Sequence, residues 1–164
     1  MDIRIAGTVD DSIVDGPGFR YTVFTQGCSH HCPGCHNPET HDFAGGRTVD
    51  TDAIVAQMRA NPLLDGLTLS GGDPMEQPAP CAELARQAHA LGLNVWCYTG
   101  YEYEQLLERE DARALLDDVD VLVDGPFLLG ERSLELRFRG SRNQRVIDMR
   151  ATRERGEVVL VEGM

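Results

Sequence analysis

Short apolar runs alternate with segments of helical periodicity along the chain from about Gly66 onward. Three of these runs, at residues 67–69, 93–98 and 119–124, favour β-strands because they are short and rich in Leu, Val and aromatic residues. Glycine follows each run within two residues, as is typical where a strand ends in a turn. The alternation predicts βα units, in which right-handed crossovers place successive strands parallel.

Two helices are predicted within this pattern. The first begins near Asp50 or Thr51, which are both good N-capping residues, and continues to residue 60, where the Asn61-Pro62 pair ends it. The second lies between the first two apolar runs and ends at Gly92. Its apolar residues recur at spacings of three and four and should face a sheet. This stripe consists of Cys81, Leu84, Ala85, Ala88 and Leu91.

Further extended segments are expected outside this region. Residues 15–20 are interpreted as a tight turn that leads into a strand over 18–26. Near the C-terminus, three more runs are predicted to be extended. They are residues 134–138, 146–149 and 158–161.

Three loops are expected to meet at one rim of the sheet. They are residues 28–35, 70–74 and 99–100, each of which follows a predicted strand directly. In parallel α/β architectures, ligands bind beyond the carboxyl ends of the strands. The candidate chemistry should therefore lie at this rim.

The length and the net charge of the chain exclude several classes of function. The 164 residues correspond to one domain and are too few for a complete eightfold barrel of about 250 residues. The formal net charge is −12, from 27 acidic and 15 basic residues, and every basic residue is arginine. The absence of lysine excludes Schiff-base chemistry on a lysine side chain. Because an acidic surface repels phosphate backbones and anionic lipids, we expect neither nucleic acid nor a membrane as a partner.

The compartment is predicted from the N-terminus and the cysteines. Residues 1–7 carry no basic leader followed by a long apolar run. No segment approaches the roughly 20 apolar residues that span a bilayer. Five cysteines in such a chain favour metal or redox use over a disulfide framework. We therefore expect a cytoplasmic protein.

The most specific chemical feature is one eight-residue run, Cys-Ser-His-His-Cys-Pro-Gly-Cys, which contains Cys28, Cys32 and Cys35. Cysteine thiolates hold iron–sulfur clusters, and a [4Fe-4S] cluster normally takes four of them. A loop that supplies three leaves one iron open to a small molecule, which favours catalysis over simple electron transfer. These three cysteines are the predicted metal ligands.

A structural zinc site of the Cys3His type is the alternative for the same cysteines. Such sites usually take two ligands from a second knuckle, and the sequence has no second Cys-x-x-Cys. Cys81 and Cys97 fall on the apolar stripe of a helix and inside a strand, where we expect them to be small buried residues. The histidines that could complete a zinc site are His30, His31, His36 and His41.

The cysteine spacing, with three and then two intervening residues, resembles the radical S-adenosylmethionine (SAM) superfamily. Members of that superfamily bind the amino and carboxylate groups of SAM on the open iron. Gly71, Gly72 and Asp73 resemble the Gly-Gly-Glu-Pro element, in which exposed backbone groups hold the methionyl amino group. The resemblance implies that these three residues contact SAM, with Asp73 in place of the commoner glutamate. A plain turn is the alternative.

Longer blocks resemble one family within this superfamily, the activating proteins of anaerobic ribonucleotide reductase. The run Cys-Pro-Gly-Cys followed by His36-Asn37-Pro38-Glu39-Thr40, with residues 15–20 upstream, carries this resemblance. Gly34 stands where the superfamily often has an aromatic residue near the adenine. The resemblance places Gly34, Cys35 and His36 beside the bound cofactor. Later blocks that also match are residues 96–101, 122–127 and 139–145.

The resemblance implies an α/β fold, namely a single-domain incomplete (open) βα barrel of the radical SAM type over residues 1–164. It implies that a reduced [4Fe-4S] cluster cleaves SAM to methionine and a 5′-deoxyadenosyl radical. That radical would take a hydrogen atom from the Cα of one glycine in the anaerobic ribonucleoside-triphosphate reductase. The implied partners are this glycyl-radical subunit and a flavodoxin- or ferredoxin-type reductant. No side chain need then act as an acid or base.

Two other functions fit the same residues. Within radical SAM chemistry, the chain could activate another glycyl-radical enzyme or act on a small molecule, as the deazaguanine-forming synthases do. From a different class, it could be a zinc-binding module without turnover.

A run of arginines near the C-terminus is a candidate docking surface. In a chain without lysine, arginine must supply the positive contacts to a partner. Arg137, Arg139, Arg142 and Arg145 could lie on a solvated edge, or pair with acidic groups of a partner or with the cofactor carboxylate. We expect Arg142 and Arg145 to contribute to docking.

Overall fold

The computed structural model describes residues 1–35 and 37–164 and is built around one mixed sheet of seven strands. The strands are β1 (Asp2–Ser12), β2 (Arg20–Thr25), β3 (Arg47–Asp50), β4 (Gly66–Gly71), β5 (Asn94–Tyr98), β6 (Val121–Asp124) and β7 (Arg145–Asp148). Their order is β3-β1-β2-β4-β5-β6-β7. The central strands β2, β4, β5 and β6 are parallel. At the two sides, β1 pairs antiparallel with β2 and β3, and β7 pairs antiparallel with β6.

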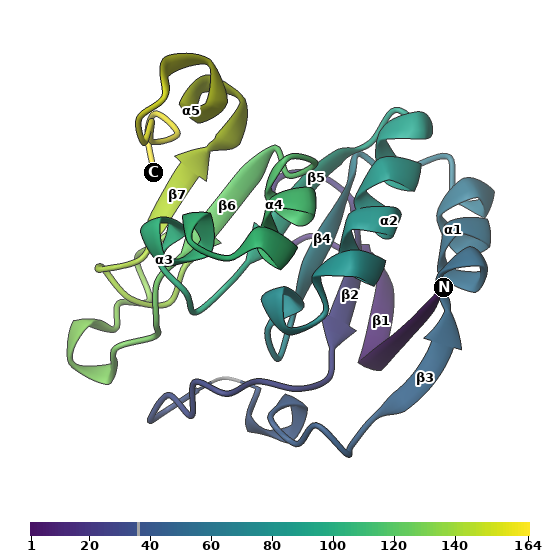
Figure 1. Ribbon diagram of the computed structural model, residues 1–164, viewed down its shortest axis with the longest axis horizontal. Helices are drawn as coiled ribbons and strands as arrows, with labels where there is room; N and C mark the ends of the chain where they lie inside the picture. The colour runs from purple at the N-terminus through teal and green to yellow at the C-terminus, as the bar shows by residue number, and fades with distance from the viewer. Residues whose placement is uncertain (36) are drawn as a thin grey trace.

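The helices α1, α2 and α4 lie together on one face of this sheet (Figure 1). The helices are α1 (Thr51–Ala60), α2 (Pro78–Ala90), α3 (Tyr103–Leu107), α4 (Glu110–Leu116) and α5 (Met149–Arg155), with short 3-10 turns η1 (Pro38–Thr40), η2 (Pro74–Glu76) and η3 (Leu129–Glu131). The main hydrophobic core fills the space between sheet and helices. Within the described residues, no helix has both the length and the apolar composition needed to cross a bilayer.

The predicted central elements are confirmed. The apolar runs at 67–69, 93–98 and 119–124 form β4, β5 and β6, and the strand expected over 18–26 is β2. Helix α1 begins after Asp50, whose side chain accepts a hydrogen bond from the Asp52 backbone N at 2.8 Å. The predicted stripe of α2 faces the core, with Leu91 partly buried at its end. Cys81 and Cys97 are fully buried, and burial raises the pKa of both thiols.

The predictions at the two sides of the sheet were less accurate. The strand expected over 134–138 is wrong, because these residues form a turn and bends that the Arg132–Ser141 bridge closes off. Of the run 146–149, the first three residues belong to β7, which is antiparallel to its neighbour, and Met149 begins α5. Residues 158–161 make only a single bridge, from Leu160 to Ile147. Strands β1 and β3 were not predicted.

The two faces of the central sheet differ in character, because side chains alternate across a strand. On the helix face, Leu67 and Leu69 of β4 join the main core. On the opposite face, Thr68 is buried next to Arg20, and Trp96 of β5 packs in a second, smaller cluster. On this face, polar and aromatic side chains of β2, β4 and β5 adjoin apolar residues such as Val123 of β6.

Arg20 is a fully buried arginine on the face away from the helices. Its guanidinium lies 5.7 Å from the centre of the Trp96 ring. Burial lowers the pKa of Arg20 to about 10. A Cβ at Gly66 would lie 2.4 Å from the guanidinium, so glycine provides the space that Arg20 fills. Its hydrogen-bond acceptors are Thr68 Oγ1, Asn94 Oδ1 and the carbonyls of Pro17 and Leu67.

Replacing Arg20 by alanine should lower the free energy of unfolding by about 3 kcal/mol, because the buried acceptors lose their charged donor. Urea unfolding of the metal-free protein measures this loss. Arg59→Ala, at an exposed position of α1, is the control and should change stability by less than about 0.5 kcal/mol. Equal stability of the two variants would contradict a structural role for Arg20.

Candidate cofactor site

The three predicted loops do meet at the carboxyl end of the parallel strands. The segment after β2 runs past the ends of the neighbouring strands, along the lower edge of Figure 1. Residues from the segments after β2, β4 and β5 line one cavity of about 120 Å³. These lining residues include Cys28, Cys32, Cys35, Gly71, Gly72, Thr99 and Gly100. The expectation of a shared rim is therefore confirmed.

The loop that contains Cys28, Cys32 and Cys35, called the cysteine segment below, is closed at its base by backbone hydrogen bonds. Gly27 N donates to Thr40 O at 2.7 Å, and Cys28 N donates to His41 O at 3.2 Å. Between these points, His31 has a φ of 52°, in the left-handed region that few residues other than glycine adopt. The fold therefore holds the two ends of the segment together while the cysteines lie along it.

The three thiols suit an iron–sulfur cluster. All of them are free, Cys28 is buried, and Cys32 and Cys35 are half-buried. Burial raises the pKa of the Cys28 thiol to about 11, so a bound cation is needed to stabilise its thiolate. The residues in 1–35 and 37–164 contain no group of three His, Cys, Asp or Glu side chains placed to hold a single metal ion. Thiols spread around a cavity fit a cluster, in which each thiolate binds its own iron.

Among the histidines that the structure describes, His41 contacts one of these cysteines. Its Nε2 lies 3.3 Å from Cys35 Sγ. Its ring also packs edge-on against His31, with ring centres 5.9 Å apart. His30 is directed elsewhere, toward Asp73.

The glycine turn after β4 lies directly against the segment after β2. Gly71 has a φ of 105°, and a Cβ there would lie 2.3 Å from Thr25 N. A Cβ at Gly72 would lie 2.4 Å from Gly27 O. Since no L-side chain fits between these backbones, the packing itself requires both glycines. Both also line the cavity with the three cysteines.

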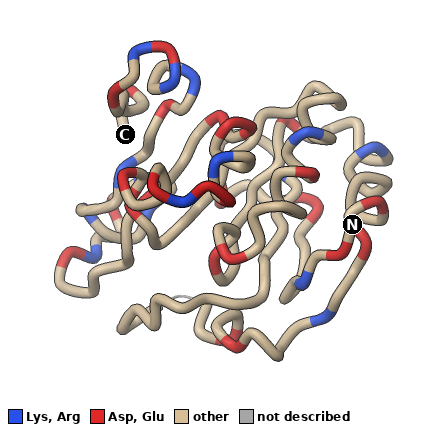
Figure 2. Tube along the Cα trace, viewed as in Figure 1, with Lys and Arg blue, Asp and Glu red and all other residues tan. Residues whose placement is uncertain are grey.

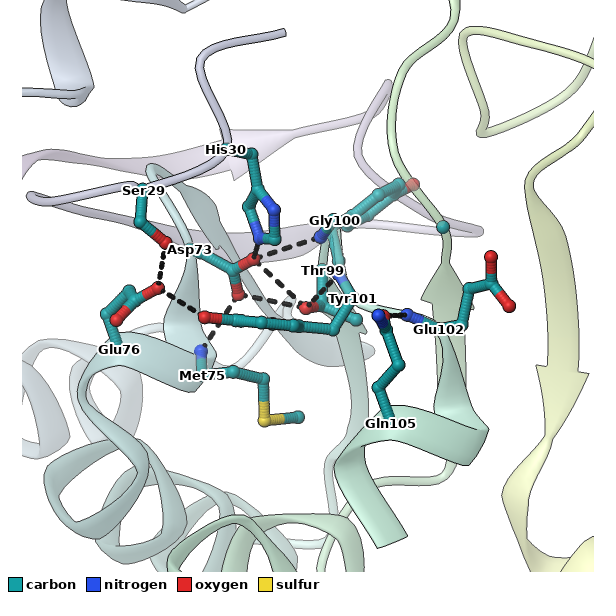
Figure 3. Close-up of polar contacts among 12 residues, drawn as sticks. Ser29, His30, Asp73, Met75, Glu76, Thr99, Gly100, Tyr101, Glu102 and Gln105 are labelled. Carbon is teal, nitrogen blue, oxygen red and sulfur yellow. Dashed lines mark hydrogen bonds and ion pairs between the residues drawn. The ribbon is translucent and has the colours of Figure 1, made fainter. Parts of the chain in front are cut away.

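Asp73 lies behind the lining of this cavity and is fully buried. Figure 3 shows its carboxylate at the centre of a hydrogen-bond network. It accepts from His30 Nε2 at 2.6 Å and from Thr99 Oγ1 at 3.0 Å. The backbone N atoms of Gly100 and Met75 donate to it at 2.9 and 3.0 Å. Asp73 thus connects the segments that follow β2, β4 and β5, and its hydrogen bond raises the pKa of His30.

The remaining predicted site residues lie at the outer side of the cysteine segment. Gly34 has a φ of 76°, and a Cβ there would lie 2.9 Å from Leu129 Cδ1. The left-handed φ favours glycine here, and a larger side chain would require Leu129 to move. His36 lies outside the described residues.

A second cavity of about 360 Å³ adjoins the first. The two share Cys35, Ser70, Tyr98, Phe127 and Gln144. Beyond these, the second cavity is lined by Val14, Asp15, Asn37, Phe138, Arg139 and Gly140. The sequence analysis assigned no cofactor contact to Tyr98, Phe127 or Gln144. Each of them nevertheless lies in a block that carried the family resemblance, and this was the signal available.

Known proteins resemble this chain over most of its length. A family model described as a 4Fe-4S single cluster domain matches residues 14–147. The anaerobic ribonucleoside-triphosphate reductase-activating protein of Haemophilus influenzae is 36% identical over 143 residues, covering 80% of this chain and 89% of the relative. That of Salmonella typhimurium is 37% identical over 146 residues, covering 84% and 94%. The chain belongs to the family of anaerobic ribonucleoside-triphosphate reductase-activating proteins.

The family extends to a bacteriophage. The protein of the same name from Enterobacteria phage T4 is 34% identical over 142 residues, covering 81% of this chain and 86% of the relative. Among solved structures, QueE from Escherichia coli has a TM-score of 0.51 at 15% identity, covering 61% of this chain and 53% of that one. The likeness to QueE concerns the fold alone. This chain thus shares part of its α/β fold with a solved structure.

Gly72→Ala should lower the free energy of unfolding of the metal-free protein by about 1–3 kcal/mol, because the added methyl group overlaps the Gly27 carbonyl. Gly7→Ala is the matched control, since a Cβ at Gly7 meets no atom within 4 Å. Chemical unfolding of both variants gives the comparison. If Gly72→Ala is as stable as the control, close backbone packing does not explain this glycine.

Proposed function

We propose that this chain is a radical SAM activase that generates the glycyl radical of anaerobic ribonucleoside-triphosphate reductase. The observation that carries the proposal is the cavity on which Cys28, Cys32 and Cys35 meet the Gly71–Gly72 turn. We further infer that residues 1–164 work as one cytoplasmic domain and that the sheet forms an open barrel. The joining of all seven strands in one sheet and the five free cysteines support these inferences.

The cavity offers ligands for two cofactors. Cys28, Cys32 and Cys35 would hold a [4Fe-4S] cluster, and the backbone at Gly71 and Gly72 would accept the amino group of SAM. A reduced [4Fe-4S] cluster held by these cysteines would supply the one electron for cleavage of SAM to methionine and a 5′-deoxyadenosyl radical, which would take a hydrogen atom from a glycine Cα. The chain's own residues bind and orient SAM and keep solvent away from it.

The target is inferred from the family. Its members are named as activating proteins of the anaerobic reductase, and this chain aligns with about nine-tenths of the two bacterial relatives described above. The second cavity beside Cys35 provides space next to the cofactors for a segment of the reductase. A flavodoxin- or ferredoxin-type protein would supply the electron.

Anaerobic reconstitution with iron and sulfide should load about four iron atoms per chain. Cys28→Ser, Cys32→Ser and Cys35→Ser should each lose most of this iron, because each removes a proposed ligand. Cys81→Ala is the control and should retain it, since Cys81 is buried in the core. Iron and sulfide analysis measures loading, and reduction in the presence of SAM should release 5′-deoxyadenosine.

A colourless protein that takes up zinc instead would contradict the proposal and favour the zinc-binding module. A loaded protein that leaves SAM intact after reduction would contradict it as well. An electron paramagnetic resonance signal of a glycyl radical on added reductase identifies the target. Its absence with this reductase but presence with another glycyl-radical enzyme would favour the other activase function.

The C-terminal part of the chain is rich in arginine and is proposed to dock the reductase. Figure 2 shows basic and acidic positions interspersed in this part of the chain. Arg145 is engaged within the chain, because its guanidinium donates to Asp124 at 2.5 Å and also bonds Glu104. Arg142 has an exposed side chain and is the cleaner candidate. Because Arg145 is paired with Asp124 and Glu104, we expect it to contribute to the stability of the fold instead of to docking.

Arg142→Glu should weaken binding to the reductase about tenfold, because an attractive charge becomes repulsive. Binding is measured by titration of the labelled reductase at low and at physiological salt. Arg59→Glu, at an exposed site on α1, is the control and should bind normally. Unchanged binding by Arg142→Glu would remove this residue from the docking surface and leave the chemistry unaffected.

A further inference from the structure

One carboxylate oxygen joins the cysteine segment to the loop after β5. Asp73 Oδ2 accepts from His30 Nε2 at 2.6 Å and from Gly100 N at 2.9 Å. The exposed fraction is 16% for the His30 side chain and 0% for Asp73, so the pair is shielded from water. Charge-assisted hydrogen bonds in such surroundings are short and strong.

The His30 ring also fits against the loop by shape. Its centre lies 4.4 Å from that of the Tyr101 ring, in an edge-to-face arrangement. A Cβ at Gly100 would lie 2.6 Å from His30 Cδ2, so only glycine leaves room for the ring. The φ of Gly100 lies outside the left-handed region, and the turn itself therefore does not demand glycine. Glycine at position 100 therefore leaves the space that the His30 imidazole occupies.

A second contact holds the same two segments together. Glu76 Oε1 accepts from Ser29 Oγ at 2.9 Å and from Tyr101 Oη at 2.8 Å. Figure 3 shows this carboxylate beside the Asp73 network. The cysteine segment is thus attached at two adjacent residues, Ser29 and His30, directly after the first cysteine.

We propose that His30, Asp73 and Gly100 form a positioning clamp that sets the cysteine segment relative to the glycine turn, and thereby sets how SAM lies against the cluster. The proposal deepens the proposed function and rests on it. Asp73 follows Gly71 and Gly72 immediately, so the same carboxylate orients the backbone proposed to bind the amino group and, through His30, the proposed cluster ligands.

The clamp also assigns a role to the Asp73 side chain. The Asp73 side chain is directed inward, where Thr99, Gly100 and His30 occupy both of its oxygens. It acts through these residues rather than by touching the cofactor. Preorganisation of this kind reduces the ordering cost when a ligand binds.

The test compares His30→Ala, Gly100→Ala and the double variant. His30→Ala removes the hydrogen bond, and Gly100→Ala pushes the ring away by occupying its space. Each single variant should raise the dissociation constant of SAM for the cluster-loaded protein about tenfold, as measured by equilibrium dialysis. The double variant should be no weaker than His30→Ala, because the methyl group then has room.

A second measurement uses the metal-free protein. Iodoacetamide should alkylate Cys28, Cys32 and Cys35 several-fold faster in His30→Ala, because the segment is less well held. Mass spectrometry of the peptides gives the rates. His30→Gln, which keeps a donor, should restore part of both effects, whereas loss of overall stability alone would not be rescued in this way.

His89→Ala is the matched control. His89 Nε2 contacts Asp120 Oδ2 at 2.8 Å, which is a similar histidine–aspartate pair in a different part of the fold. Its loss should leave SAM affinity and the alkylation rates unchanged. Wild-type affinity and alkylation in His30→Ala, or additive losses in the double variant, would overturn the clamp. If the loaded wild-type protein fails to bind SAM, the proposed function fails, and the alkylation rates still decide the clamp.

Discussion

The close approach of two backbones is the constraint on which the site depends. The chain after β4 touches the chain after β2 at Gly71 and Gly72, where even a methyl group would overlap main-chain atoms. Parallel pairing of β2 with β4 brings the two segments to this position, with Thr25 opposite Gly71 in the register. Because Gly27 also accepts a hydrogen bond from Asp73 N, the cysteine segment begins from a fixed point. These contacts fix the position of Gly71 and Gly72, which line the cavity with the three cysteines.

The sheet also has a buried polar cluster around Arg20. The sheet buries an arginine on the face away from the helices and satisfies it with side-chain and carbonyl acceptors. Trp96 covers its guanidinium, and Tyr98, two residues further along β5, lines both cavities. Burial raises the pKa of the Tyr98 hydroxyl, so it stays protonated. Strand β5 therefore contributes Trp96 to the packing around Arg20 and Tyr98 to the lining of the site.

The central fold and the cysteines were predictable because their signals are local. Apolar runs followed by glycine identified β4, β5 and β6, and the cysteine spacing identified the segment that follows β2. Strand β3 has no buried residue, so no hydrophobic pattern marks it. Leu134 illustrates the opposite error, since the run 134–138 was predicted to be extended, yet this side chain is 93% exposed in a loop. The roles of His30 and Asp73 depend on contacts between distant segments, which periodicity does not reveal.

The proximity of Leu129 to Gly34 has a consequence during synthesis of the chain. The cysteine segment leaves the ribosome well before η3, the element that covers its outer side. During that interval the segment lacks the Leu129 side chain beside Gly34. The contact on the outer side of the cysteine segment therefore forms only after most of the chain has been made.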